Sequence, residues 1–324
     1  MVTKTEGVLF VSLLTQPLYH KWGTTSEIHA TTHSMRNVVR LLSSPLTAFL
    51  ILLLLVNATS LFGFATFVKH PSLLARWPWT QDIFAVSYPL FSRLQMALAG
   101  LAMITPLMST HRFRWVPAFI AVYALSFAME FGGTSWGIPF GKYEYTGLLG
   151  PKIAGKVPYL IPLSWFTMAL PSFWMASPPS SPLVETSRFN WKRVLLGSGF
   201  LSCWDLTLDP AMSFLAPFWV WQEPGTYYGM PWRNLIGWIF TGFLLMIALE
   251  LFRAHHWKEK LPKNFDFTLY GASLFLPLGM CMLSGLWGTL LFTASVFAGL
   301  VYATRTTSAA LAKPDKPKFN SLHT

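Results

Sequence analysis

The sequence predicts an all-α fold, a polytopic bundle of transmembrane helices, and three observations lead to this prediction. The chain has 324 residues, of which 53% are hydrophobic and only 11% are charged, whereas soluble proteins average about 25% charged residues. Apolar stretches of the length that a helix needs to cross a bilayer recur along almost the whole sequence. Segments rich in Gly, Pro, Lys and Arg separate these stretches. We therefore expect one integral membrane domain rather than two soluble ones.

Eight stretches are long and apolar enough to be membrane spans. They are Pro45–Val68, Pro89–Met108, Trp115–Phe131, Val157–Ala176, Trp191–Asp209, Asn234–Phe252, Thr268–Ser284 and Leu286–Ala303. The last two come from one apolar run of 36 residues, which is too long for a single ordinary span. We divide this run at Gly285, and a single span there would reduce the number to seven.

The distribution of basic residues predicts the orientation of the helices. With an even number of spans, most Lys and Arg residues fall on the side that carries both termini, and such residues accumulate in cytoplasmic loops. We thus expect both termini in the cytoplasm, a membrane domain over residues 45–304 and a basic flexible tail over residues 305–324. Residues 1–44 are expected to form a poorly structured extension, compatible with a transit peptide or with a true start at Met35.

The positive charge of the chain indicates lipid contact rather than nucleic-acid binding. The net charge is +11, but the basic residues lie in loops between apolar segments and form no recognition motif, so we expect anionic lipid and no nucleic acid as the partner. Cys203 and Cys281 both lie in apolar stretches. They indicate neither a disulfide framework nor a zinc site.

The predicted topology brings acidic residues of separate spans to one membrane face. Two long loops, Gly132–Lys156 and Pro210–Arg233, emerge together on the non-cytoplasmic side. Glu130 closes the third span, and Asp205 and Asp209 close the fifth. These three carboxylates can therefore belong to one site.

Charged residues at this depth have a structural interpretation as well as a functional one. An ionisable group at the centre of a membrane helix costs about 2.5–3.5 kcal/mol, so such groups tend to be paired or functional. Arg93 lies in the second span at the same predicted depth, and it would pair with Glu130 or Asp209 in a purely structural layer. At the cytoplasmic end of its span, Glu250 has Arg253 three residues on, and we expect a local ion pair.

The segment WDLTLDPAM, Trp204–Met212, favours catalysis. Asp205 and Asp209 are four residues apart, a spacing that places both on one face of a helix. Two such carboxylates repel when both are ionised, and burial also disfavours their charge, so at least one is expected to keep its proton near neutral pH. A retained proton makes a general acid. For Asp209 alone, a capping or turn role before Pro210 is the alternative.

Aromatic residues are the second signal at this face. The chain contains 15 Trp, 10 Tyr and 27 Phe, and many of them belong to the belts that mark membrane interfaces. The others can line a groove for a flat, elongated apolar ligand, where ring faces stabilise a carbocation. Those near the predicted face are Trp136, Tyr143, Tyr145, Trp165, Trp204, Trp219, Trp221, Tyr227, Tyr228 and Trp238.

The motifs of several cofactor classes are missing from the sequence. No histidine lies in a predicted span, and the one HxxxH pair, His29 and His33, lies in the N-terminal extension, which argues against a di-iron oxygenase. An Asp-rich pair of motifs for magnesium diphosphate, a Walker loop and a GxGxxG turn are also missing. We expect a reaction that needs neither metal nor cofactor.

Three segments resemble the membrane carotenoid-biosynthesis hydratases, the family of cyanobacterial γ-carotene 1'-hydroxylases and archaeal bisanhydrobacterioruberin hydratases. They are EFGGTSWGIPFGKYEYTGLLGPKIAGKVPYLIPLSWF (Glu130–Phe166), WDLTLDPAM (Trp204–Met212) and WVWQEPGTYYGMPWRNLIGWIFTG (Trp219–Gly242). The likeness covers roughly Ser44 to Ala303. It implies addition of water across the C1,2 double bond of an acyclic carotenoid ψ-end of the γ-carotene or lycopene type, which gives a tertiary alcohol without oxygen or cofactor.

The candidate site combines the residues derived above with those that the resemblance implies. The expected catalytic residues are Glu130, Asp205 and Asp209, and Arg93 and Lys142 are expected to give electrostatic support. The expected substrate-binding residues are Tyr143, Tyr145, Trp165, Trp204, Trp221, Tyr228, Asn234 and Trp238.

In the expected mechanism, a protonated Asp205 or Asp209 protonates C2 and leaves a tertiary cation at C1. Aromatic faces stabilise this cation, and water oriented by the other carboxylate or Glu130 adds to it. The substrate would come from the bilayer of a bacterial cytoplasmic or thylakoid membrane, with the active face non-cytoplasmic and other carotenoid-pathway enzymes as protein partners. The alternatives are a carotenoid end-group cyclase or other isoprenoid enzyme, and a transporter or scaffold of a pigment complex.

Overall fold

The computed structural model describes residues 44–177, 189–223 and 225–311, and most of this part of the chain is helical. The helices are α3 (Pro45–Gly63), η1 (Phe64–Val68), α4 (Ser72–Arg76), α5 (Trp79–His111), α6 (Val116–Trp136), α7 (Leu160–Met175), α8 (Trp191–Asp209), η2 (Pro210–Leu215), α9 (Trp232–Leu251), η3 (Ala254–Lys260), α10 (Phe265–Leu283) and α11 (Trp287–Leu311). The strands are β1 (Tyr143–Tyr145), β2 (Lys152–Ile153), β3 (Val157–Pro158) and β4 (Trp219–Trp221). The predicted helix bundle is confirmed.

Each of the eight predicted spans coincides with a helix. Six are long and apolar enough to cross a membrane, namely α3 with η1, α5, α6, α9, α10 and α11. The division of the last apolar run is confirmed, because α10 ends at Leu283 and Gly285 adopts a left-handed conformation before α11 begins at Trp287. α11 continues to Leu311, beyond the predicted end of the domain. The number of helices that cross the bilayer and the location of the termini remain predictions, and the predicted extension over residues 1–44 lies almost wholly outside the described residues.

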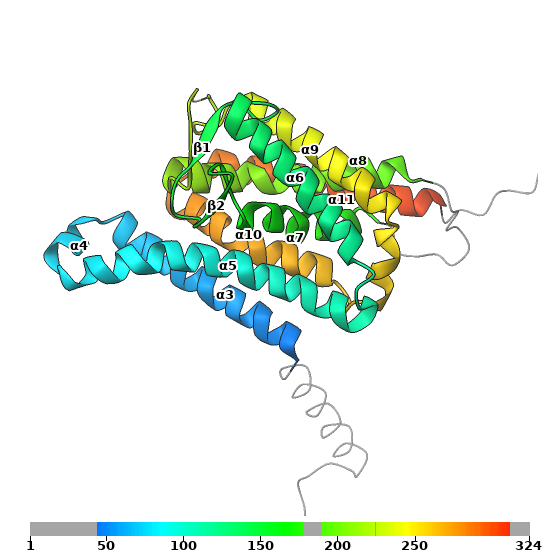
Figure 1. The fold of residues 1–324 in the computed structure, drawn as a ribbon, viewed down its shortest axis with the longest axis horizontal. Helices are drawn as coiled ribbons and strands as arrows, with labels where there is room; N and C mark the ends of the chain where they lie inside the picture. Colours follow the sequence, from blue (N-terminus) through cyan, green and yellow to red (C-terminus); the bar gives the residue numbers. More distant parts are fainter. Residues whose placement is uncertain (1–43, 178–188, 224, 312–324) are drawn as a thin grey trace, which may run out of the picture.

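The other two helices that coincide with predicted spans, α7 and α8, lie at the centre of the bundle. In α7, 14 of the 16 residues are buried, and in α8, 13 of 19 are buried. Figure 1 shows α7 and α10 between a layer that contains α6, α8 and α9 and a second layer made by α3 and α5. A helix shielded by its neighbours can carry polar residues, because it does not need an apolar surface towards lipid.

The second predicted span is longer than expected. α5 begins at Trp79, ten residues before the predicted start at Pro89, and it has 33 residues. Its N-terminal half packs with the end of α3, with η1 and with α4 in an arm that projects from one end of the bundle (Figure 1). Large apolar side chains of this arm, among them Phe62, Trp79 and Ile83, are more than half exposed.

Two short antiparallel sheets join the loops and were not predicted from the sequence. β1 pairs with β4, and β2 pairs with β3. Since β1 belongs to the loop after α6 and β4 to the loop after η2, the first sheet joins the two long loops that we expected at one face of the membrane. The expectation that these loops lie together is therefore confirmed.

At the opposite end of α8, a buried ion pair fixes this helix to α9. Arg193 donates to Glu250 through Nε at 2.8 Å and through Nη2 at 3.0 Å, and Glu250 Oε1 also accepts from the backbone N–H of Asn190 at 3.0 Å. The expected local pair of Glu250 with Arg253 is wrong. The actual partner lies 57 residues away in sequence, where local spacing gives no signal.

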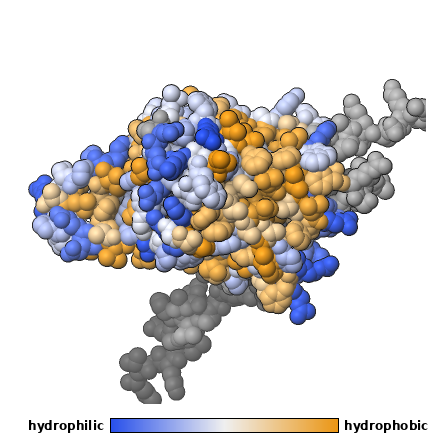
Figure 2. Space-filling model, turned by 45° about the horizontal axis from the view of Figure 1, so that its top comes forward, coloured by the Kyte–Doolittle hydropathy of each residue, from blue (hydrophilic) through white to orange (hydrophobic). Residues whose placement is uncertain are grey.

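The surface of the bundle fits a membrane environment. Figure 2 shows a broad apolar zone on one face of the molecule, with hydrophilic residues gathered on both sides of it. Of the most apolar 18-residue stretch of α11, only 11% is buried inside the protein, so most of this helix is available to contact lipid.

Candidate active site

A cavity of about 400 Å³ lies between the two layers of helices. Aromatic and aliphatic side chains make up most of its wall, and residues of α3, α5, α6, α7, α8, α9 and α10 contribute to it. Glu130 and Asp209 both line the cavity. The structure thus brings carboxylates of α6 and α8 to one apolar chamber, as the sequence predicted.

Glu130 is held by three donors from the loop after α6 and from α7. Tyr145 Oη donates to Glu130 Oε2 at 2.8 Å, and Tyr143 Oη donates to the same oxygen. Trp165 Nε1 donates to Oε1 at 2.8 Å. Both carboxylate oxygens therefore have partners, and hydrogen bonds of this kind stabilise a buried carboxylate.

Asp209 is held by a different set of donors. Its Oδ1 accepts from Ser213 Oγ at 2.8 Å, from Trp219 Nε1 at 3.0 Å and from Trp221 Nε1 at 3.2 Å. Ser213 belongs to η2, which continues α8 as a π-helix from Pro210. A π-helical turn of this type is frequent at functional sites.

Asn234 at the start of α9 connects Asp209 with Asp205. Its Nδ2 donates to Asp209 Oδ2 at 2.5 Å and to Asp205 Oδ2 at 3.1 Å, and all three side chains are almost completely buried. The spacing of four residues on α8 makes this possible, because it turns both carboxylates to the same neighbour. Within the described residues, Asp205 Oδ1 has no hydrogen-bond partner.

The β1–β4 ribbon carries donors for both acids. Tyr143 is opposite Trp221 and Tyr145 is opposite Trp219 in the antiparallel register, so these four rings lie on one face of the ribbon. The rings of Tyr143 and Trp221 are 4.9 Å apart. Burial, followed by the neighbouring Glu130 carboxylate, raises the pKa of Tyr143 and of Tyr145 well above the ordinary value. Both hydroxyls therefore remain donors at neutral pH.

Two glycines let the loop fold back over the end of α6. A Cβ on Gly132 would lie 2.6 Å from the Ile138 carbonyl oxygen, and one on Gly133 would lie 2.8 Å from ring atoms of Phe140 and Tyr143. Neither position has room for a side chain. The close approach of Tyr143 to Glu130 thus depends on the absence of a side chain at Gly133.

Indole rings form the adjoining wall of the cavity. Trp165 and Trp238 are stacked with 4.1 Å between centroids, and Trp204 meets Trp238 edge-on at 5.9 Å. All three rings line the cavity. Stacked aromatic faces of this kind can bind a polyene and stabilise positive charge.

Three expected members do not join the site as predicted. Arg93 donates to the backbone carbonyls of Leu148 and Gly147 at 3.0 and 3.3 Å, so its role is to hold the loop and not to pair with a carboxylate. Lys142, directly before β1, is exposed. Side chains alternate between the two faces along a strand, and Tyr143 and Tyr145 of β1 point inwards. Tyr228 lies outside the cavity lining and contacts Phe214 and Tyr227.

Sequence reasoning missed one group of cavity residues. Asn57 of α3, Gln95 of α5 and Ser273 of α10 also line the chamber, and each lies in an otherwise apolar segment. A polar residue inside a predicted span was the available signal. Nothing in the sequence showed that the three segments meet.

The comparisons with known proteins identify the family. The model of the family described as "Carotenoid biosynthesis protein" matches residues 91–300. A bisanhydrobacterioruberin hydratase of Haloarcula japonica is 28% identical over 163 residues, which are 50% of this chain and 53% of that protein. The matched region thus spans about half the length of this relative. No solved structure matches the chain.

The family match extends over more than half of the sequence and contains all three carboxylates of the site. It begins at residue 91, whereas the resemblance was expected from Ser44. Taken with the six long apolar helices, this match shows that the chain is an integral membrane protein that belongs to the carotenoid biosynthesis protein family.

Proposed function

We propose that the protein is a carotenoid 1,2-hydratase, which adds water to the C1,2 double bond of an acyclic ψ-end group of the γ-carotene or lycopene type. The observation that carries the proposal is the placement of Glu130 and Asp209 at the wall of an apolar, aromatic cavity, with Asp205 joined to Asp209 through Asn234. The named relative, a hydratase, supports the same class of reaction.

The proton comes from the Asp205–Asp209 pair. Both carboxyl groups meet on the neutral amide of Asn234, and two ionised carboxylates held so close would repel each other strongly, so the pair retains one proton. This proton passes to C2 of the substrate as the π bond opens. The bond electrons form the new C–H bond and leave a tertiary cation at C1.

The cation forms where aromatic rings and Glu130 surround it. The faces of Trp165, Trp204 and Trp238 stabilise positive charge, and Glu130 supplies a carboxylate held by three donors. Water then adds to C1, and the proton that it releases returns to the carboxylate pair. The reaction consumes one alkene and one water and needs no cofactor, and the apolar wall limits other routes for the cation.

The substrate enters from the bilayer. One end of the cavity is lined by Phe62, Trp79 and Ile83 of the projecting arm, and these side chains are 67%, 67% and 58% exposed. A carotenoid is itself dissolved in the hydrocarbon region of the membrane. We therefore propose that one end group reaches the carboxylates while the rest of the polyene extends along this arm into lipid.

The test is expression of the full chain in a bacterium that accumulates lycopene or γ-carotene, followed by mass analysis of the pigments. Hydration predicts a product heavier by one water, with label from ¹⁸O-water and none from ¹⁸O-dioxygen. Asp205→Asn, Asp209→Asn and Glu130→Gln should each lower the yield at equal membrane levels of protein. Full activity of both Asp variants, or label from dioxygen, would refute the proposal. A product of unchanged mass would identify an end-group cyclase, and unchanged pigment would favour a transporter or scaffold.

A further inference from the structure

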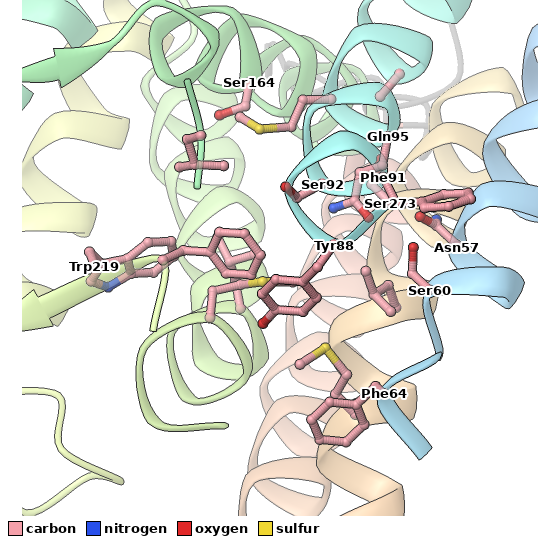
Figure 3. A pocket seen from close by; sticks show the side chains of 18 of the residues that line it. Asn57, Ser60, Phe64, Tyr88, Phe91, Ser92, Gln95, Ser164, Trp219 and Ser273 are labelled. Atoms are coloured by element: carbon pink, nitrogen blue, oxygen red, sulfur yellow. The ribbon is translucent and has the colours of Figure 1, made fainter. Parts of the chain in front are cut away.

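A second polar group lines the same cavity on the side formed by α3, α5 and α10. It consists of Asn57, Gln95 and Ser273, and we call it the amide cluster. Figure 3 shows these side chains on one side of the chamber and Trp219, a donor to Asp209, on the other side, with Tyr88 between them. The cavity therefore has an acidic side and a neutral polar side.

The amide cluster offers hydrogen-bond acceptors that the described part of the protein leaves unused. Asn57 is 0% exposed, and its Nδ2 donates to the backbone carbonyl of Ala272 at 2.9 Å. This bond orients the amide and makes Oδ1 the free end. Asn57 Oδ1, Gln95 Oε1 and Ser273 Oγ are all buried without a hydrogen-bond partner among the described residues.

Other hydroxyl groups of the same wall do not share this property. Ser60 Oγ donates to the carbonyl of Val56 at 2.8 Å, and Ser92 Oγ donates to that of Pro89 at 2.9 Å. Such bonds to the preceding turn are common for serine in apolar helices. The free acceptors are thus a particular feature of the amide cluster and not a general feature of polar residues in this cavity.

Unpaired polar groups in a membrane helix bundle are costly, because lipid offers them no hydrogen bonds. A ligand that donates hydrogen bonds removes this cost. Two amide oxygens accept hydrogen bonds and one hydroxyl can donate a bond, so a fitting ligand donates two bonds and accepts one. Water can do this, whereas an alcohol has a single O–H to donate. A buried water typically has about three polar partners, which is the number of free groups here.

We propose that the amide cluster holds the water that attacks the cation, which makes it the nucleophile site of the hydration reaction. The inference rests on the proposed function. The water oxygen gives a lone pair to C1 and forms the C–O bond, and the oxonium proton passes through cavity water to the carboxylate pair that protonated C2. The acid and the nucleophile are thus held by separate side chains on opposite sides of one cavity.

The experiment separates protonation from water capture. Membranes that contain the full chain are incubated with the alkene in D₂O, and both the tertiary alcohol and the deuterium in recovered alkene are measured. A cation that finds no water loses a proton from C2 or from an adjacent methyl group and returns as deuterated alkene. Ser273→Ala and Gln95→Met should raise the ratio of deuterated alkene to alcohol about tenfold, the effect of one lost hydrogen bond of about 1.4 kcal/mol.

Ser60→Ala is the matched control, because it removes a cavity hydroxyl that is already bonded to its own helix. Its ratio should equal that of the wild type. An unchanged ratio in both cluster variants, or a parallel fall of exchange and hydration, would overturn the inference. A wild type that neither exchanges nor hydrates would instead refute the proposed function.

A second arm of the experiment tests the other source of an O–H donor. Substrates with and without a hydroxyl group at the far end are compared in the cluster variants. The nucleophile site predicts the same change for both substrates. An effect confined to the KM of the hydroxylated substrate would show that the cluster binds a substrate hydroxyl, and it would overturn the inference.

Discussion

Replacement of Asn234 by leucine tests whether the two aspartates work as a pair. Leucine has nearly the shape of asparagine but donates no hydrogen bond, so Asn234→Leu removes the bonds to Asp209 and Asp205, at 2.5 and 3.1 Å, with little change in packing. Asp209 keeps Ser213, Trp219 and Trp221 as donors. Asp205 loses the amide that orients it.

The magnitude follows from the strength of these bonds. A hydrogen bond to a charged group contributes about 1.5–3 kcal/mol net, and 1.36 kcal/mol in the activation barrier changes a rate tenfold. One of the two carboxyl groups carries the charge in the proposed mechanism, so one charge-assisted bond is lost. We expect the rate of alcohol formation to fall about 10- to 150-fold.

The assay measures alcohol formation from the alkene in membranes with equal amounts of wild-type and variant protein, determined by immunoblot. Thr241→Val is the matched control, because Thr241 is on the same helix and 0% exposed, and its hydroxyl has no partner in the described part of the chain. This control should stay within about twofold of the wild type. An Asn234→Leu rate in the same range would refute the idea of a coupled pair.

Three further substitutions test other contacts of the fold and the site. Tyr145→Phe removes a donor to Glu130 and should lower the hydration rate about tenfold. The control Tyr123→Phe loses a bond to a backbone carbonyl and should leave that rate unchanged. Equal hydration rates of the two variants would contradict the role of Glu130. Gly133→Ala forces Tyr143 away from Glu130, so its hydration rate should fall while its membrane level persists. Glu250→Gln leaves Arg193 buried without its charged partner and should cost about 3–5 kcal/mol of stability, measured as a lower Tm in detergent, and an unchanged Tm would show that the ion pair is dispensable.

The sequence predicted the acidic side of the cavity because its signals are local. The four-residue spacing of Asp205 and Asp209 fixes their common face as soon as the segment is helical. Glu130 follows from its position at the end of an apolar span. The pairing of the two long loops follows from the order of the spans along the chain. The helix bundle itself was predictable because the spans are long apolar runs.

Other features depend on contacts between segments that are distant in sequence. Glu250 was assigned to Arg253 by proximity in sequence, but the fold brings Arg193 to it. Lys142 was counted as support for the acids, but the alternation of side chains along β1 turns it outwards. The ribbon of β1 and β4 has only three residues in each strand, too few for a recognisable strand pattern.

The amide cluster could not be predicted from the sequence for the same reason. Asn57, Gln95 and Ser273 belong to three separate helices, and each is a single polar residue among apolar neighbours. Such a residue is equally consistent with a bond to its own backbone, as Ser60 has. Only the packing of α3, α5 and α10 around one cavity distinguishes the two cases.

The three-residue ribbon makes the two acids interdependent. Four of its rings donate to carboxylates, two to Glu130 and two to Asp209, and a shift of one residue in either strand would turn both rings of that strand outwards. Fraying of this short ribbon would therefore remove two donors from each acid in a single event, and it would leave Trp165 on Glu130 and Ser213 and Asn234 on Asp209.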